Sequence, residues 1–257
     1  MKDVKRFIDS RLGMYSFYFE DLNSGYCYVT NENVIMPAAG CIKLPIAISL
    51  MHQAEEGNID FKDKIFIGKK DMIYNGGILN ELDEREYSIN ELMIAMLMQN
   101  DDTATNKLID IMGIDEINSG LYDMGLMNTK LTGKFSQKNL QANKNVSTCK
   151  DISKCWKLLL DEKFLSQEHS SRIINILKKQ QVKNRITFFY LEKIKDTVAS
   201  NPGEEEYVEN DTAYIDIDKG KFIVTVMSNN LPNNVYGMVT VSKIGKMVLD
   251  IIQTSWN

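Results

Sequence analysis

Histidine, proline and cysteine are all scarce in this sequence. Its 257 residues include only 2 His, 4 Pro and 4 Cys. So few histidines argue against catalysis that relies on imidazole groups and against a His-rich metal site. The cysteines form no C-x-x-C pair, so we expect free thiols and no bound metal or cofactor; they are Cys27, Cys41, Cys149 and Cys155. The low proline content, with 15 Gly, excludes collagen-like and disordered proteins.

The sequence also lacks an excess of charge of one sign and a long hydrophobic run. Lys and Arg number 30 against 35 Asp and Glu, a net charge of −5, which gives no basic surface for nucleic acid or an anionic membrane. No apolar run approaches the ~20 residues that span a bilayer, so we expect no membrane span. Charged residues interrupt the first 12 positions, unlike an export signal. If Met1 is the native start, we expect a cytoplasmic protein.

Hydrophobic periodicity predicts both helices and strands. After a short N-terminal amphipathic helix, strands are expected at 14–19, 26–30, 195–200, 213–218 and 221–228. Helices are expected at 42–55, 89–98, 103–112, 151–160, 168–181 and 239–252. Ser88 and Glu91 have the spacing of a capping box at the start of the second of these helices.

The order of these elements predicts an α+β fold. Strands at both ends of the chain indicate one antiparallel sheet built from both termini and flanked by the terminal helices. The helical stretch between them would form an all-helical subdomain. We therefore predict a discontinuous sheet subdomain, residues 1–38 and 190–257, and a helical subdomain, residues 39–189, together forming one domain.

Four short segments carry a more specific pattern. Met36–Ala47 resembles the region around the S-x-x-K motif of class A β-lactamases and related penicillin-binding proteins, and Gln99–Asn106 resembles their S-D-N segment. Tyr74–Leu79 resembles a glycine-containing loop that faces the same site, and Val198–Glu204 stands where the K-T-G strand should be. The resemblance covers nearly the whole chain in the right order. It implies the β-lactamase/transpeptidase-like fold, with a five-stranded antiparallel sheet and an all-helical part.

The resemblance also shows which catalytic groups the sequence lacks. Counting back three residues from Lys43, the position of the serine nucleophile holds Gly40, which has neither hydroxyl nor thiol. The second serine, which relays a proton in the family, corresponds to Asn100, and the asparagine of that motif corresponds to Asp102. The lysine and threonine of K-T-G correspond to Asn201 and Pro202, so only Gly203 is kept.

The general base that releases the acyl group in class A enzymes is a glutamate on a loop before residue 145. Residues 124–150 contain no Asp or Glu, so no carboxylate of this segment could activate a water molecule. The segment carries lysines instead, which either are simply solvated or form a docking surface for a partner; they are Lys130, Lys134, Lys138, Lys144 and Lys150.

The residues that remain leave several interpretations open. In the family fold the lysine at the place of Lys43 points into the cleft, and the asparagine at the place of Asp102 approaches it. The resemblance therefore implies a buried cation that needs a partner, and we predict an ion pair with Asp102 in which Lys43 cannot act as a base. Cys41 is a nucleophile at a helix start, but it lies one residue from the required position, ~100° around the helix. Glu204 either ends a strand in solvent or faces the cleft with Asp101 or Asp102, which would make the cleft anionic and suited to a cationic or neutral ligand.

We therefore predict a pseudoenzyme of the class A β-lactamase type, with no confirmed catalytic residue. Its cleft would bind a small molecule, a peptide or another partner; the predicted cleft residues are Gly40, Cys41, Lys43, Tyr74, Asn100, Asp102, Asn201, Gly203 and Glu204. The alternative is an enzyme of different chemistry on the same scaffold, such as an amide- or peptide-modifying hydrolase or transferase that uses Lys43, Asp101, Asp102 or Cys41.

Overall fold

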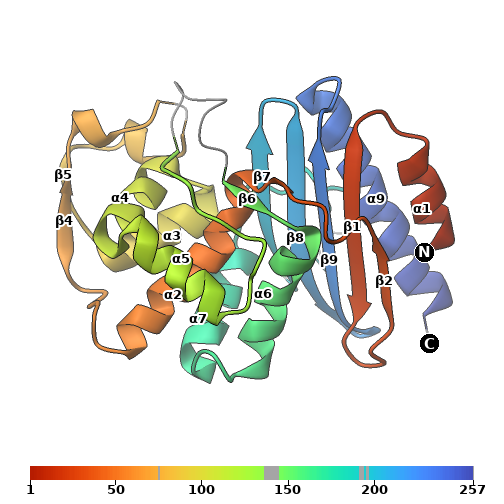
Figure 1. Cartoon of the computed structure of the whole chain (residues 1–257), viewed down its shortest axis with the longest axis horizontal. Helices are drawn as coiled ribbons and strands as arrows, with labels where there is room; N and C mark the ends of the chain where they lie inside the picture. The colour runs from red at the N-terminus through yellow and green to blue at the C-terminus, as the bar shows by residue number, and fades with distance from the viewer. Residues whose placement is uncertain (75, 136–144, 191–193, 195–196, 257) are drawn as a thin grey trace.

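The computed structural model has at its centre one five-stranded antiparallel sheet (Figure 1). The structure describes residues 1–74, 76–135, 145–190, 194 and 197–256. The strand order is β2-β1-β9-β8-β7. The strands are β1 (Met14–Asp21), β2 (Cys27–Thr30), β7 (Val198–Glu205), β8 (Val208–Ile217) and β9 (Gly220–Asn229). Strands from the two ends of the chain pair directly, β1 with β9, which confirms the predicted α+β architecture.

The sheet separates two hydrophobic cores because its side chains alternate between two buried faces. On β1, Phe17 and Phe19 pack in the core beneath α1 (Lys2–Asp9) and α9 (Asn234–Ser255), while Tyr18 belongs to the core shared with the other helices. Figure 1 shows α1 and α9 together on one side of the sheet and the remaining helices on the other. Helices therefore cover both faces of the sheet.

The second core surrounds α2 (Lys43–Glu55), which follows the short 3-10 helix η1 (Ala39–Ile42). Most of α2 is buried, as expected for a helix enclosed by others. Those packed around it in this core are α3 (Ile89–Gln99), α4 (Asp102–Met112), α5 (Ile114–Asp123), α6 (Cys149–Asp161) and α7 (Gln167–Lys178). In the part of the chain described, no helix is long and apolar enough to cross a membrane.

Helix ends follow local capping chemistry. Ser88 Oγ accepts a hydrogen bond from the Glu91 amide at 3.2 Å, and a Glu91 carboxylate oxygen accepts one from the Ser88 amide at 2.8 Å. The predicted capping box is therefore confirmed. Helix α9 begins five residues before the predicted position, because Asn233 caps its first turn by accepting a hydrogen bond from the Tyr236 amide at 2.8 Å.

Two sequence predictions need correction. The last part of the predicted strand 195–200 is the start of β7, which runs on through Pro202 to Glu205; Lys195 and Asp196 lie outside the described residues. Proline is tolerated there because β7 is the edge of the sheet and its missing amide breaks no ladder. The middle of the chain is also not all helical, since β3 (Met36–Pro37) pairs with β6 (Val146–Ser147) and β4 (Lys64–Ile67) with β5 (Arg85–Ser88).

The five strands of the main sheet come from residues 14–30 and 198–229, and helices α2 to α7 lie between them in the sequence. This places the start of α2 beside the edge strand β7, where η1 packs against it. Subdomain boundaries at 38/39 and 189/190 stay a prediction.

Candidate functional site

A cavity of about 310 Å³, called the cleft below, lies where the N-terminus of α2, the C-terminus of α3 and the edge strand β7 meet. Five predicted cleft residues line it: Gly40, Lys43, Asn100, Asp102 and Glu204. Five more residues line it: Gly76, Gly77 and Gln99, which belong to segments expected at the site but were not named as cleft residues, and Phe135 and Val182, which were not predicted. The sequence motifs therefore converge on one cavity, although Gly40 and Glu204 are 164 residues apart in the chain.

The ammonium group of Lys43 is held at the base of the cleft. Its side chain is 0% exposed, and Nζ lies 2.7 Å from Asp102 Oδ1 and 2.6 Å from the Asn100 carbonyl oxygen. The ring of Phe135 lies below it, with Nζ 4.7 Å from the ring centre. The predicted Lys43–Asp102 ion pair is confirmed. Lys43 Nζ is therefore engaged as a donor to both Asp102 and the Asn100 carbonyl.

Asn100 ends α3 in the left-handed conformation, with φ 55° and ψ 34°. Asparagine tolerates this region better than most residues, and the turn directs the Asn100 carbonyl toward Lys43. The buried side-chain oxygen Oδ1 has no hydrogen-bond partner among the described residues. Asn100 therefore supplies a carbonyl acceptor to the lysine and an amide side chain to the cleft wall.

No side chain fits at position 40 without movement of its neighbours. A Cβ atom built on Gly40 would lie 2.7 Å from the Pro202 carbonyl oxygen and 2.8 Å from Asn100 Oδ1. The same close approach recurs at Gly203, where a Cβ would lie 2.7 Å from the amide nitrogens of Gly40 and Cys41. Two glycines thus let β7 approach η1 closely, and the space for a nucleophile is filled.

Three predicted cleft residues lie behind the cleft wall instead of lining it. Asn201 is 1% exposed and donates from Nδ2 to the Cys41 carbonyl at 2.9 Å, while the Cys41 thiol donates to the Asn201 carbonyl at 3.1 Å. With Gly203, these residues join β7 to η1. Burial raises the pKa of the Cys41 thiol well above its ordinary value, the opposite of what a thiolate nucleophile needs.

Tyr74 and Asp101 also differ from expectation. Tyr74 is 70% exposed and is not part of the cleft wall; the following glycines, Gly76 and Gly77, line the cleft instead. Asp101 is buried and caps α4, where it accepts hydrogen bonds from the amides of Ala104 at 2.7 Å and Leu79 at 2.8 Å. Burial raises its pKa. Its carboxylate thus binds the backbone.

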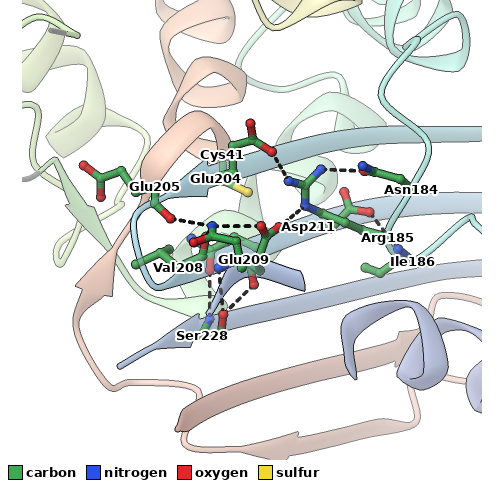
Figure 2. A network of polar contacts seen from close by, with 12 residues as sticks. Cys41, Asn184, Arg185, Ile186, Glu204, Glu205, Val208, Glu209, Asp211 and Ser228 are labelled. Carbon is green, nitrogen blue, oxygen red and sulfur yellow. Dashed lines mark hydrogen bonds and ion pairs between the residues drawn. The ribbon is translucent and has the colours of Figure 1, made fainter. Parts of the chain in front are cut away.

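The sequence prediction missed Arg185, which anchors one wall of the cleft (Figure 2). Its guanidinium is 1% exposed, donates from Nε to Glu209 at 2.6 Å and forms an ion pair with Glu204. Asp211 lies nearby and accepts a hydrogen bond from the Ile186 amide at 3.0 Å, and burial raises the pKa of Asp211 to about 7. Glu209 and Asp211 are buried, and buried carboxylates need a cation, but no motif in the sequence identified Arg185 as that cation.

The charges of the cleft are unequally exposed. Both cations are buried, Lys43 at 0% and Arg185 at 1% exposure. Two of their carboxylate partners reach solvent, Asp102 at 27% and Glu204 at 61%, whereas Glu209 stays buried at 4%. A ligand entering the cleft therefore meets carboxylate oxygens first. Within the described residues, no three His, Cys, Asp or Glu side chains gather as a metal site.

The segment that lacks carboxylates reaches the cleft through Phe135. Lys134 forms an ion pair with Asp110 on α4, and Lys130 is exposed. Lys138 and Lys144 lie outside the described residues. Docking of a partner on these lysines stays a prediction.

A sequence profile of the β-lactamase enzyme family matches residues 1–252. The chain belongs to the β-lactamase enzyme family. No curated protein sequence matches it. Among solved structures, the chain is similar to a β-lactamase from Sphaerobacter thermophilus, with 24% identity, a TM-score of 0.91, and 98% of this chain and 97% of that one covered.

Two further relatives show the same fold. A protein described as PBP-A has 20% identity and a TM-score of 0.89 over 98% of this chain and 95% of that one. The ancestral class A β-lactamase of Gram-negative bacteria has 18% identity and a TM-score of 0.87 over 97% and 98%. These likenesses confirm the β-lactamase/transpeptidase-like fold that the sequence resemblance implied.

Proposed function

We propose that this member of the β-lactamase family does not hydrolyse β-lactams and instead binds a ligand in its cleft. The observation that carries the proposal is the environment of Gly40. The position that resembles the serine site has no nucleophile, and the Pro202 carbonyl and the Asn100 side chain occupy the space where one would stand. Without a nucleophile at this position, the family's acyl-enzyme cannot form.

Other features of the site support the same conclusion. Lys43 is bound by Asp102 and the Asn100 carbonyl, so it is not free to act as a base. Asn100 has no hydroxyl group to relay a proton. Residues 124–150 supply no carboxylate for deacylation. Losing one member of a catalytic unit typically costs orders of magnitude in rate, and here several are absent together.

The alternative of new chemistry on the old scaffold gains no support from the candidate nucleophiles and acids. The Cys41 thiol is buried with a raised pKa, and Asp101 is engaged in backbone hydrogen bonds. The outward-facing carboxylates of Asp102 and Glu204 favour a cationic or neutral ligand over the carboxylate of a penicillin.

We expect this protein to act in the cytoplasm.

Two assays test the absence of β-lactam chemistry. The protein is incubated with a chromogenic cephalosporin and with a fluorescent penicillin, beside an active class A β-lactamase as positive control. We expect no hydrolysis above the buffer rate and no increase in protein mass by intact mass spectrometry. A covalent penicillin adduct, even without turnover, would overturn the proposal. Such an adduct is known in the fold, because a structurally similar PBP-A variant is described as an acyl-enzyme complex with penicillin G.

A thermal-shift comparison tests the ligand preference. A ligand at free concentration L that binds only the native state stabilises it by RT ln(1 + L/Kd), so at equal concentration the ligand with the lower Kd raises the melting temperature more. We expect small organic amines to stabilise the protein more than benzylpenicillin at equal concentration. Tight, non-covalent penicillin binding would contradict the charge argument.

A further inference from the structure

An apolar groove runs beside α3 and meets the cleft. It has a volume of about 230 Å³ and is walled mostly by hydrophobic side chains, among them Ile78, Leu82, Ile94 and Met98. Two of these side chains are substantially exposed, Ile78 at 40% and Leu82 at 43%. Exposed apolar side chains gathered around a concave surface are typical of binding sites.

The groove and the cleft are neighbouring cavities. Gln99, the last residue of α3, lines both cavities. The loop before η3 (Leu79–Glu81) also serves both, because Gly76 and Gly77 line the cleft and Ile78 lines the groove. The two cavities therefore lie on either side of the same few residues.

The rim of the groove carries no uncompensated positive charge. Arg85 lies over the ring of Tyr87, with Cζ 3.8 Å from the ring centre, and its NH2 group is 3.1 Å from a carboxylate oxygen of Glu91. The Arg85 guanidinium thus has a carboxylate partner and rests against an aromatic ring. In the cleft next to it, Asp102 and Glu204 are paired with Lys43 and Arg185, but their carboxylates are more exposed than those two cations. The combined site is thus apolar at one end and presents carboxylate oxygens at the other.

We propose that the cleft and the groove form one site for a small organic amine that carries an apolar chain. The ammonium group would lie beside the carboxylates of Asp102 and Glu204, and the chain would pass Gln99 into the groove. The two volumes are those of small-molecule cavities, which favours such a ligand over a macromolecular partner. This inference rests on the proposed ligand-binding function and names its ligand class.

A homologous series of amines tests the inference. Binding of benzylamine, 3-phenylpropylamine and 5-phenylpentylamine to the full chain is measured by isothermal titration calorimetry at pH 7. We expect affinity to rise about fourfold for each methylene group that enters the groove. The neutral alcohol 5-phenylpentanol should bind more weakly than the matching amine, because it lacks the charge that Asp102 and Glu204 attract.

Single variants test the contributions of the groove and of the cleft separately. Leu82→Gln should reduce the gain from chain length and leave benzylamine binding unchanged. Glu204→Gln should weaken the whole amine series by a similar factor. The matched control is Val239→Gln, on the exposed face of α9, which should change neither; Val239 is 48% exposed, similar to Leu82.

Each outcome decides between the two proposals. If amines bind with an affinity that does not depend on chain length, the groove inference is wrong while ligand binding in the cleft stands. If no amine binds but a short basic peptide does, the inference is overturned in favour of a peptide ligand. If neither binds, both the inference and the ligand-binding part of the proposed function fail.

Discussion

At the scale of single residues, the side chain of Asn100 is compatible with glycine at position 40 and leaves no room for a larger residue there. The Asn100 side chain occupies space that a serine at position 40 would need, since its Oδ1 lies 2.8 Å from the place of a Cβ atom. The Pro202 carbonyl occupies the other side of the same space. A single substitution that places serine at position 40 would therefore still meet the Asn100 side chain and the Pro202 carbonyl.

Gly40→Ser is accordingly expected to destabilise the protein and not to restore β-lactam chemistry. Overpacking of a buried site of this kind typically lowers the free energy of unfolding by about 1–3 kcal/mol. Urea unfolding measures the loss, and intact mass spectrometry after penicillin treatment should show no adduct. Adding Asn100→Gly removes one of the two obstacles, and glycine suits the left-handed backbone at position 100, so part of the stability should be recovered. Full recovery would mean that the Pro202 carbonyl does not clash with a side chain at position 40.

The Lys43–Asp102 ion pair also makes a prediction at this scale. Asp102→Ala leaves a fully buried ammonium with only the Asn100 carbonyl, so unfolding free energy should fall by about 2 kcal/mol. The loss is smaller than that of fully buried pairs because Asp102 is 27% exposed. Asp102→Asn, which keeps an acceptor oxygen, should lose less. In a double-mutant cycle with Lys43→Met, an interaction energy near zero would contradict the pairing.

At the scale of elements, the capping box of α3 fixes where the helix starts and therefore where it reaches the cleft. The helix begins at Ile89 and ends at Gln99, and its last residues line both the cleft and the groove. Loss of the cap should act on stability more than on the site itself, because Ser88 lies at the opposite end of the helix.

Ser88→Ala removes the side-chain acceptor of the Glu91 amide. The free energy of unfolding should fall by about 1 kcal/mol, as for other N-cap replacements. Ser88→Thr is the matched control, because threonine keeps the hydroxyl group and should retain most of the stability. A loss as large in the threonine variant as in the alanine variant would show that the hydroxyl does not cap the helix.

At the scale of the whole molecule, the acidic groups around Arg185 connect the edge of the sheet with the segment that precedes it. Glu204 and Glu209 come from β7 and β8, while Arg185 comes from the loop after α7. Burial raises the pKa of Glu209 as well as that of Asp211. Such a cluster of charges makes the stability of the fold depend on pH.

Asp211 should make the protein less stable as the pH rises. Its pKa is raised from 3.8 to about 7 by burial, so between these values the folded state holds a proton that the unfolded state has released. This contribution to the unfolding free energy is complete below pH 3.8 and is lost as the pH rises through about 7. In Asp211→Asn the loss should be absent.

Urea unfolding from pH 4.5 to 7.5 measures this difference. The stability of the natural protein relative to Asp211→Asn should decrease with pH and level off above about 7. Asp218→Asn, in the exposed turn between β8 and β9, is the control and should show no such trend. A relative stability that stays constant for Asp211→Asn would contradict a raised pKa in the folded state.

The sequence alone determined the parts of this protein that depend on local chemistry. Hydrophobic periodicity and capping residues placed most strands and helices, as at Ser88. The resemblance of two motifs to those of a known family implied that Gly40, Lys43, Asn100 and Asp102 are neighbours and that Lys43 pairs with Asp102. Elements set by longer contacts were missed, as at β4 and β5, whose pairing depends on tertiary context.

Only the tertiary structure decided which side of a strand or helix turn each residue faces. Asn201 and Cys41 are near the cleft in sequence but lie behind its wall, while Arg185, far from every motif, anchors Glu204. The room at position 40 depends on Asn100 and Pro202, which are 60 and 162 residues away in the chain. The physical reason is that periodicity reports burial, whereas the shape and charge of a cavity depend on which distant side chains pack against one another.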